Sequence, residues 1–370
     1  MNNAFKTFIG CSLIHLCIGS VYAMSVLYPQ AMDLTGWNNS VLIIGFSLTI
    51  LALGFTASLH QKWFRGRKKV SVLCQATSMW LISNMAMGYN IFGEINSEML
   101  HYFFSIILGI AIGLLYVIPI NISTTYRTTS GNASGLIVCF FGVGSILASK
   151  LYSSCDLSNS VHVLLYVLCY TIILSVGIKL IREGLKEDTI LVYDNTFKRD
   201  KNWYVLALMF FFNIGIGISL LSNLTQLSLL NGFSMEYAIF LVGLAGLFNA
   251  FGRFLYPTLV VMKNIGRFRM VDIITDLQAF ALFVLIISSG ELLWGLSVAV
   301  VISVYGGMFA LMPSLMKQVY NDTNAYSQIL SMWGLAGLIC PIIFNWFGLP
   351  SLLIMCAILL FCNGYLELYD

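Results

Sequence analysis

The sequence has 370 residues, of which 59% are hydrophobic and only 9% are charged. Soluble domains carry about 25% charged residues, so this composition excludes an ordinary soluble protein and indicates a protein embedded in a lipid bilayer. The net charge of +3 says little about partners, but the basic residues are scattered among loops, and no nucleic-acid partner is expected.

Apolar stretches of about the 20 residues that a membrane helix needs follow one another with short connections. The twelve stretches are residues 6–30, 38–61, 70–92, 100–126, 131–154, 160–181, 202–230, 236–262, 270–289, 291–317, 323–347 and 349–368. Apart from Arg253, the only lysine or arginine that would not lie on the side of the N-terminus is Lys150. The positive-inside rule therefore predicts that both termini are cytoplasmic, in a plasma or bacterial inner membrane.

The first apolar stretch contains His15 deep in the span and Tyr22 and Tyr28 toward its outer end. An intramembrane histidine can carry a proton, because its unperturbed pKa is about 6.5. It can equally be a packed polar residue that is hydrogen-bonded to a neighbouring helix, and the sequence leaves both readings open. The nine cysteines show no CxxC pair and are expected to be small packing residues, with only Cys155 near a surface.

The eighth stretch carries a permanent cation, Arg253, near the middle of the apolar run 241–262. At the centre of a bilayer this charge costs roughly 2.5–3.5 kcal/mol on insertion scales, so it persists where it faces a water-filled cavity or a partner. Either Arg253 binds an anion in transit, or it only caps carbonyl groups or pairs with another helix. The sequence favours the anion-binding role.

The longest polar stretch, residues 182–201, separates six apolar stretches from six. Across it, the pair Gly-Arg at 66–67 recurs at 266–267, and GLLYVIP at 113–119 recurs as GMFALMP at 307–313. These repeats predict two homologous six-helix bundles, residues 1–181 and 202–370, joined by a cytoplasmic linker. Such a duplication is typical of the major facilitator fold, in which substrate binds between the halves near the membrane midplane.

The sequence resembles the oxalate:formate antiporter group of the major facilitator proteins over most of both halves. The resemblance depends on several motifs taken together: IHLCIGSVYAMSV, GIAIGLLYVIPI, SGNASGLIVCFFGVGS, LVGLAGLFNAFGR, FALMP and MWGLAGLICP. It implies transport of small carboxylates, and the fold is usually monomeric. No HExxH motif, paired intramembrane acids or Ser–His pair of recognisable spacing is present, so neither an enzyme nor a cofactor is expected. Arg253 matches the family's substrate-binding arginine, and the expected lining aromatics are Tyr22, Tyr28, Tyr116, Tyr305, Phe309 and Trp333.

Physical chemistry supports these roles independently of the resemblance. An arginine presents a planar fork to a carboxylate, and aromatic walls strengthen this charge-assisted bond by excluding water. The oxalate-specific members carry a second cation one turn after the tryptophan, where this sequence has Ala336. One cation neutralises a dianion poorly, so monocarboxylates such as formate, lactate or pyruvate are expected rather than oxalate.

A further departure from the family's pattern concerns the inner gate. The acidic residue that usually precedes the inner Gly-Arg pair is replaced by Trp63 and Lys263. The basic residues expected at the inner gate must therefore pair with other groups. These basic residues are Arg67, Arg127 and Arg267. Asp272 and Asp276 can either pair with Arg267 or Arg127, or only cap the start of their helix.

The mammalian-type monocarboxylate transporters are the next most similar family. They share the arginine but carry an aspartate one turn earlier, where this chain has Asn249, which cannot carry a proton. Proton coupling, if it exists, then falls to His15 or to the substrate. Asn249 is expected to contact the substrate together with Arg253. The remaining alternatives are a proton-coupled symporter and a carrier of another small organic solute on the same fold.

Overall fold

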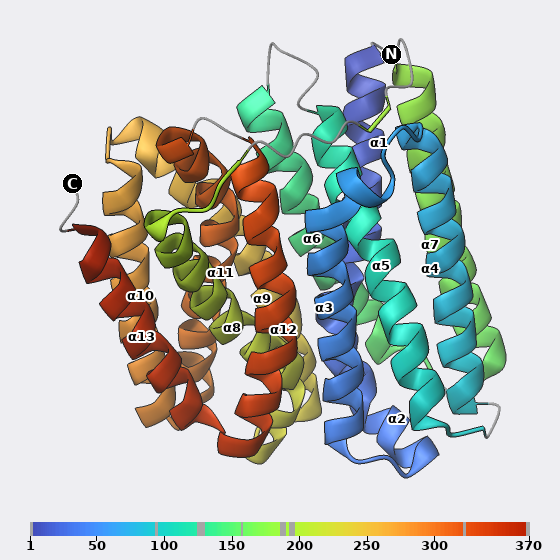
Figure 1. The fold of residues 1–370 in the computed structure, drawn as a ribbon. Helices are drawn as coiled ribbons and strands as arrows, with labels where there is room; N and C mark the ends of the chain where they lie inside the picture. The colour runs from blue at the N-terminus through green and yellow to red at the C-terminus, as the bar shows by residue number, and fades with distance from the viewer. Residues whose placement is uncertain are drawn as a thin grey trace.

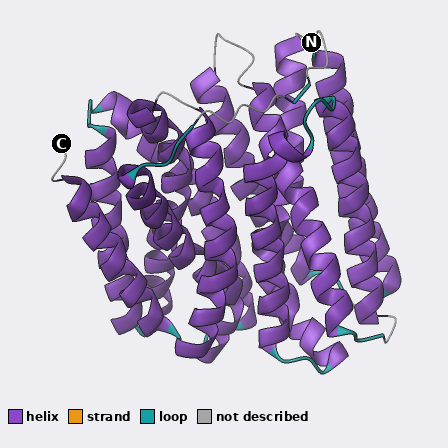
Figure 2. Cartoon of the chain, in the orientation of Figure 1, coloured by secondary structure: helices purple, strands orange, loops and turns teal. Residues whose placement is uncertain are grey.

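The computed structural model describes residues 3–92, 95–123, 130–156, 158–185, 190–191, 197–320 and 323–367. Nearly all of these residues belong to helices joined by short loops (Figure 2). Each predicted apolar stretch corresponds to one helical segment, except that the first is divided into three.

The helices form two side-by-side groups in Figure 1, one from each half of the sequence. The first group contains α1 (Asn3–Ile18), η1 (Gly19–Leu27), α2 (Tyr28–Thr35), α3 (Asn39–Trp63), α4 (Lys69–Phe92), α5 (Glu98–Ser123), α6 (Ser130–Ser153) and α7 (Ser160–Gly184). The second contains α8 (Lys201–Leu230), α9 (Met235–Met262), α10 (Arg267–Ile287), α11 (Glu291–Tyr320), α12 (Thr323–Phe347) and α13 (Leu349–Glu367).

Ten of these helical segments are long and apolar enough to cross a membrane, judged by length and composition within the described residues. The segments from α1 through α2 count as one of the ten, α4 is not among them, and α13 is counted only as a shorter apolar helix. The start of α1 and the end of α13 lie at the same end of the molecule (Figure 1), as an even number of crossings requires.

Helices pack against one another within each group, and the two groups contact each other along two interfaces, here called seams. In the first group α3 packs on α5 and α1 packs on α7, and in the second α9 packs on α11 and α8 on α13. Between the groups, the main contacts are α3 with α12 and α6 with α9. Glycines allow this close approach: a Cβ on Gly54 would lie 2.2 Å from the backbone nitrogen of Gly334, and one on Gly142 would lie 2.6 Å from the carbonyl oxygen of Gly246.

The first apolar stretch is not the single helix that the sequence predicts. After Ile18 the chain tightens into the 3-10 helix η1, which is nine residues long, whereas most 3-10 runs are no longer than three or four residues. The change begins where α1 crosses α6 closely, because a Cβ on Gly19 would lie 1.9 Å from the carbonyl oxygen of Phe141. This local conformation depends on a contact with α6 that hydrophobic periodicity does not report.

The linker overlaps slightly with the helices beside it. The predicted linker 182–201 begins inside the last turn of α7 and ends on the first residue of α8. One described part of it is bound to the loop after α3, because Gly66 donates its N–H to Leu191 at 2.9 Å and Leu191 donates to Arg67 at 3.1 Å. The division of the chain at 181 and 202 stays a prediction.

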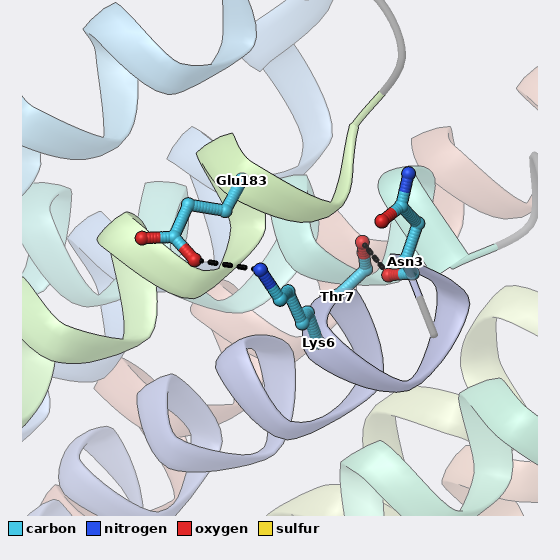
Figure 3. Close-up of polar contacts among 4 residues, drawn as sticks. All are labelled: Asn3, Lys6, Thr7 and Glu183. Carbon is cyan, nitrogen blue, oxygen red and sulfur yellow. Dashed lines mark hydrogen bonds and ion pairs between the residues drawn. The ribbon is translucent and has the colours of Figure 1, made fainter. Parts of the chain in front are cut away.

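An ion pair joins the two terminal helices of the first group near the start of α1. Lys6 on α1 lies 2.9 Å from the carboxylate of Glu183 on α7, and beside it Thr7 donates to the carbonyl of Asn3 at 3.1 Å (Figure 3). Both charged side chains are partly exposed, at 27% and 41%. An exposed pair of this kind contributes little to stability, so helix packing rather than this bridge holds α1 against α7.

Candidate functional site

Arg253 lies where the two helix groups meet, and its side chain is almost completely buried. The helix that carries it, α9, begins at a Ser234 cap, whose hydroxyl accepts the N–H of Tyr237 at 3.1 Å. Only 2% of Arg253 is exposed. One turn earlier, the Oδ1 of Asn249 accepts the Nε–H of Arg253 at 2.9 Å. The i, i+4 spacing of these two residues on one helix face makes this contact possible.

The guanidinium lies against one aromatic ring from each helix group. Its central carbon is 5.6 Å from the ring centroid of Phe141 on α6 and 4.9 Å from that of Phe309 on α11. Cations within about 6 Å of a ring centroid are attracted to its face. These ring contacts fix the plane of the guanidinium and exclude water from it, but they do not neutralise its charge.

Among the described residues, no carboxylate pairs with Arg253, since their two ion pairs are Lys6 with Glu183 and Arg269 with Asp272. The hydroxyls of Tyr22, Tyr116 and Tyr305 are close enough to interact with its charge. Within the same described set, neither terminal nitrogen of the guanidinium makes a well-aligned hydrogen bond. The Tyr116 hydroxyl is near enough for a loose contact with the guanidinium, but the two terminal nitrogens are left without a well-formed hydrogen bond among the described residues.

Other buried donors near Arg253 are also unpartnered. Neither the Nδ2 of Asn249 nor the Nε1 of Trp333 makes a well-aligned hydrogen bond among the described residues, although the Tyr22 hydroxyl lies near the Trp333 indole. Trp333 packs on Phe309 with ring centroids 4.8 Å apart, so its indole belongs to the same aromatic enclosure as the guanidinium. Buried polar groups are nearly always hydrogen-bonded, and a group of unused donors calls for an acceptor.

The expected aromatic residues are brought together, with one exception. Tyr22 on η1 and Tyr305 on α11 share a hydrogen bond between their hydroxyls, which links the two helix groups. Tyr116 on α5 packs edge-on against Trp333 on α12, with centroids 5.2 Å apart. Tyr305 and Phe309 are in ring contact at 5.3 Å.

Tyr28 is the exception. It begins α2 and lines a separate cavity inside the first helix group, whose lining residues do not include Arg253. Tyr22 lies within η1, whereas Tyr28 lies beyond the end of η1, at the start of α2.

His15 lies beside the Arg253 site rather than on a separate helix face. Its ring packs on Tyr116 with centroids 5.3 Å apart, and it is near enough to Arg253 for their charges to interact. Its Nδ1 is 3.1 Å from the carbonyl of Cys11 and must donate there, because a carbonyl only accepts. The Nε2 has no partner among the described residues, so the neutral ring presents a free acceptor.

The residues expected at the inner gate have other partners. Arg67 donates to Gln75 at 3.4 Å, and Arg267 donates to Gln318 at 3.1 Å. Asp272 lies 3.9 Å from Arg269. Arg127 lies outside the described residues.

Neither aspartate caps the start of α10. This helix begins at Arg267 with Gly266 as its N-cap, which places Asp272 in the second turn and Asp276 in the third. Asp276 is near Cys356 of α13, so this neighbour belongs to the same helix group as Asp276 itself. The capping interpretation of the two aspartates is therefore wrong.

Three residues beside the site were not anticipated. Phe141 contacts the guanidinium directly, Cys139 donates its thiol to the carbonyl of Ala250 at 3.5 Å, and Tyr326 is near enough to interact with Arg253. For Phe141 a signal existed in the sequence. The glycine that follows it lets α6 approach α9, and this brings the preceding ring beside the arginine.

No protein-family model matches the sequence, and no curated protein matches it. Solved structures do match its fold. A bacterial homologue of the human lysosomal transporter Spinster, in an inward-facing and occupied conformation, is similar with a TM-score of 0.70 at 14% identity, over 98% of this chain and 95% of that one. The inward-facing and unoccupied form matches with a TM-score of 0.68 at 13% identity, over 95% and 81% of the two chains.

A D-xylose-proton symporter matches with a TM-score of 0.67 at 12% identity, over 98% of this chain and 96% of that one. At these identities the likeness establishes architecture and nothing finer. Together with the largely helical structure and its two side-by-side helix groups, it confirms the predicted fold class. The chain is an all-helical membrane protein with the major facilitator fold.

Proposed function

We propose that this protein is a secondary transporter that carries small monocarboxylate anions, such as formate, lactate or pyruvate, by alternating access between its two helix groups. Arg253 binds the carboxylate, and the aromatic residues around it form the wall of the site. The observation that carries this proposal is the buried guanidinium whose two terminal nitrogens make no well-aligned hydrogen bond among the described residues, although the Tyr116 hydroxyl lies close by.

An anion is the ligand that fits this set of groups. The guanidinium fork, the amide of Asn249 and the indole of Trp333 all present donors, and Asn249 already uses its acceptor on Arg253. A carboxylate offers two oxygens in the geometry that an arginine fork matches, and such charge-assisted bonds are about twice as strong as neutral ones. A neutral sugar would leave the buried charge without compensation, which is expensive in a dry site.

The charge count supports a single negative charge on the substrate. Arg253 is the one arginine or lysine that the described part of the chain places in this enclosure, and Ala336, one turn after Trp333, is buried and uncharged. A second carboxylate would therefore have to be buried without a cation. The aromatic rings favour a substrate with a short apolar part, as in lactate or pyruvate.

Alternating access is supported by the position of the hydrogen bonds that join the two helix groups. Asn345 donates to Ser40 at 2.9 Å and Thr225 donates to Ser25 at 3.3 Å, both at the end of the molecule away from the termini. Between that end and the guanidinium lies the hydroxyl pair of Tyr22 and Tyr305. These contacts close the outer route to Arg253, and their separation would open it.

Proton-coupled symport is a second candidate, which the position of His15 favours. Its Nε2 has no hydrogen-bond partner among the described residues, and its ring lies near the charge of Arg253. A bound carboxylate would add a negative charge beside the ring, so anion and proton would each favour the binding of the other. Replacing His15 with glutamine tests this: dependence of uptake on a pH gradient should disappear while exchange of anions continues.

The transport proposal is tested with the purified protein in lipid vesicles. Initial uptake of labelled formate, lactate and pyruvate is measured beside a neutral sugar, for the natural chain and for Arg253→Ala. The matched control is Arg199→Ala, because Arg199 lies outside the site, where it donates to Gln328. We expect anion uptake by the natural chain and the control, and none by Arg253→Ala. Uptake of the sugar alone, or full activity of Arg253→Ala, would reject the proposal.

A further inference from the structure

The first helix group contains a partly open cavity of about 100 Å³ that is separate from the Arg253 site. Its walls come from η1, α2 and α3 on one side and from α4, α5, the end of α6 and α7 on the other. It lies toward the end of the group away from the termini, since Tyr28 and His101 of its lining are near the outer ends of their helices. Neither Arg253 nor any aromatic residue in contact with it lines this cavity.

Two buried polar groups of the lining have no hydrogen-bond partner among the described residues. One is the hydroxyl of Tyr28, whose residue is 5% exposed, and the other is the Nδ1 of His101, whose residue is 4% exposed. The other two tyrosines of the lining satisfy each other, because the hydroxyls of Tyr152 and Tyr166 are hydrogen-bonded. Each unpartnered buried group costs roughly 1–3 kcal/mol, so a ligand that satisfies them would gain affinity.

The rest of the lining is mainly apolar and has no charge of its own. Methionine, leucine, isoleucine, valine and tryptophan side chains dominate it, and it includes no aspartate, glutamate, lysine or arginine. A charged ligand would lose its hydration there without a counter-ion. An apolar cavity of about 150 Å³ in another protein stays dry and binds benzene, so a cavity of this size and character suits a small organic molecule better than a cluster of waters.

We propose that this cavity is a binding site for a small uncharged molecule with an apolar ring or short chain and one hydroxyl or carbonyl oxygen, which Tyr28 and His101 hold. The helix η1 divides this site from the Arg253 site: Ser20 and Met24 face the cavity, whereas Tyr22 reaches Tyr305. The proposal does not depend on anion transport, because it shares no lining residue with the guanidinium enclosure.

A native cysteine in the lining allows a direct test with phenol as the probe. Cys155 is half-buried and lines the cavity, and burial together with the neighbouring Asp156 raises the pKa of its thiol. The rate at which N-ethylmaleimide modifies Cys155 in the purified full-length protein is measured by mass spectrometry, with and without phenol. Cys74, which is exposed on α4 and is not part of the lining, serves as the internal control.

With phenol at about four times its Kd, modification of Cys155 should slow about fivefold, because reactivity follows the unoccupied fraction. Modification of Cys74 should not change. Toluene, which has the same ring without the hydroxyl, should bind about tenfold more weakly, the factor expected for one net hydrogen bond. The change Tyr28→Phe should remove much of this preference for phenol over toluene.

A variant that fills the cavity provides the complementary control. Val163 of α7 lines the cavity and is 6% exposed. In Val163→Phe, modification of Cys155 should be insensitive to phenol. Equal slowing of Cys74 and Cys155 by phenol, or equal protection by phenol and toluene in the natural chain, would overturn the proposal.

Discussion

Asn249 accepts the Nε–H of Arg253 at 2.9 Å from one turn earlier on the same helix, and this places an uncharged amide where a carboxylate would neutralise the cation. The contact fixes one edge of the guanidinium and leaves the other edge free. The positive charge is thereby oriented without being cancelled, which is the condition that an anion-binding site requires.

Changing Asn249 to aspartate should weaken anion binding strongly. The carboxylate would accept the same hydrogen bond and add a negative charge beside the guanidinium, in a buried site where charges interact strongly. We expect a loss of affinity of about tenfold or more, since each 1.4 kcal/mol corresponds to a factor of ten. Binding of labelled lactate to the purified variant measures this.

The same variant should acquire a dependence on pH that the natural chain lacks at this position. Protonation of Asp at position 249 removes the competing charge, so affinity should rise as the pH falls. The control is Asn249→Ala, which loses the hydrogen bond without adding a charge and should bind lactate better than the aspartate variant. Equal affinities of the aspartate and alanine variants would contradict the charge argument.

The hydroxyl pair of Tyr22 and Tyr305 should stabilise the closed arrangement of the two helix groups. Replacing either residue with phenylalanine leaves the other buried hydroxyl without its partner, which should lower the free energy of unfolding by about 1–3 kcal/mol. Replacing both should cost less than the sum of the two single changes, because the second removes a group that is already unpaired. Unfolding of the three variants in detergent tests this, and strictly additive losses would show that the pair makes no contribution.

A lysine in place of Ala336 should change substrate preference from monocarboxylates to dicarboxylates. Ala336 is fully buried on α12, one turn after Trp333, so a cation there would give a second carboxylate a partner near the site. Competition by oxalate against labelled formate uptake measures the change. The variant Ala336→Gln separates the effect of charge from that of size. An unchanged ratio of oxalate to formate inhibition in Ala336→Lys would refute the charge-counting argument.

The seam between α3 and α12 should not tolerate a side chain at Gly54. An added Cβ would lie 2.2 Å from the backbone nitrogen of Gly334, and neither backbone can yield locally. Overpacking of this kind typically costs about 1–3 kcal/mol, so the closed state should be depleted and initial uptake should fall about tenfold.

The matched control for that seam is Gly266→Ala. The nearest atom to a Cβ at Gly266 is 4.0 Å away, and its φ of −56° suits any residue. Both variants should reach the membrane in normal amounts, and only Gly54→Ala should lose uptake. Normal uptake by Gly54→Ala would show that the helix groups do not need this close approach.

Much of this architecture could be predicted from the sequence, because the length and hydropathy of the apolar stretches directly indicate the membrane-spanning helices. Arg253 could be singled out for the same reason, since one charge in an apolar run of membrane length is conspicuous. The paired motifs, such as the Gly-Arg repeat, indicated two halves, and the structure places several of the expected aromatic residues near the arginine, where their role stays a prediction.

What could not be predicted depends on contacts between helices. The 3-10 segment η1 begins where Gly19 approaches α6 closely, and Tyr28 lies beyond its end, at the start of α2, where it lines the separate cavity. Phe141 reaches the guanidinium only because Gly142 lets α6 meet α9. The partners of Arg67 and Arg267 are glutamines rather than acids, and charge patterns do not reveal such neutral partners.

The most direct measurement is equilibrium binding of labelled formate, lactate and pyruvate to the purified natural chain and to Arg253→Gln. The glutamine keeps polar atoms at the position but removes the charge and the fork. The account predicts saturable binding to the natural chain and an affinity at least about thirtyfold lower in the variant, as expected when one partner of a buried charge pair is removed. Equal affinities in the two proteins would contradict the assignment of Arg253 as the anion-binding residue.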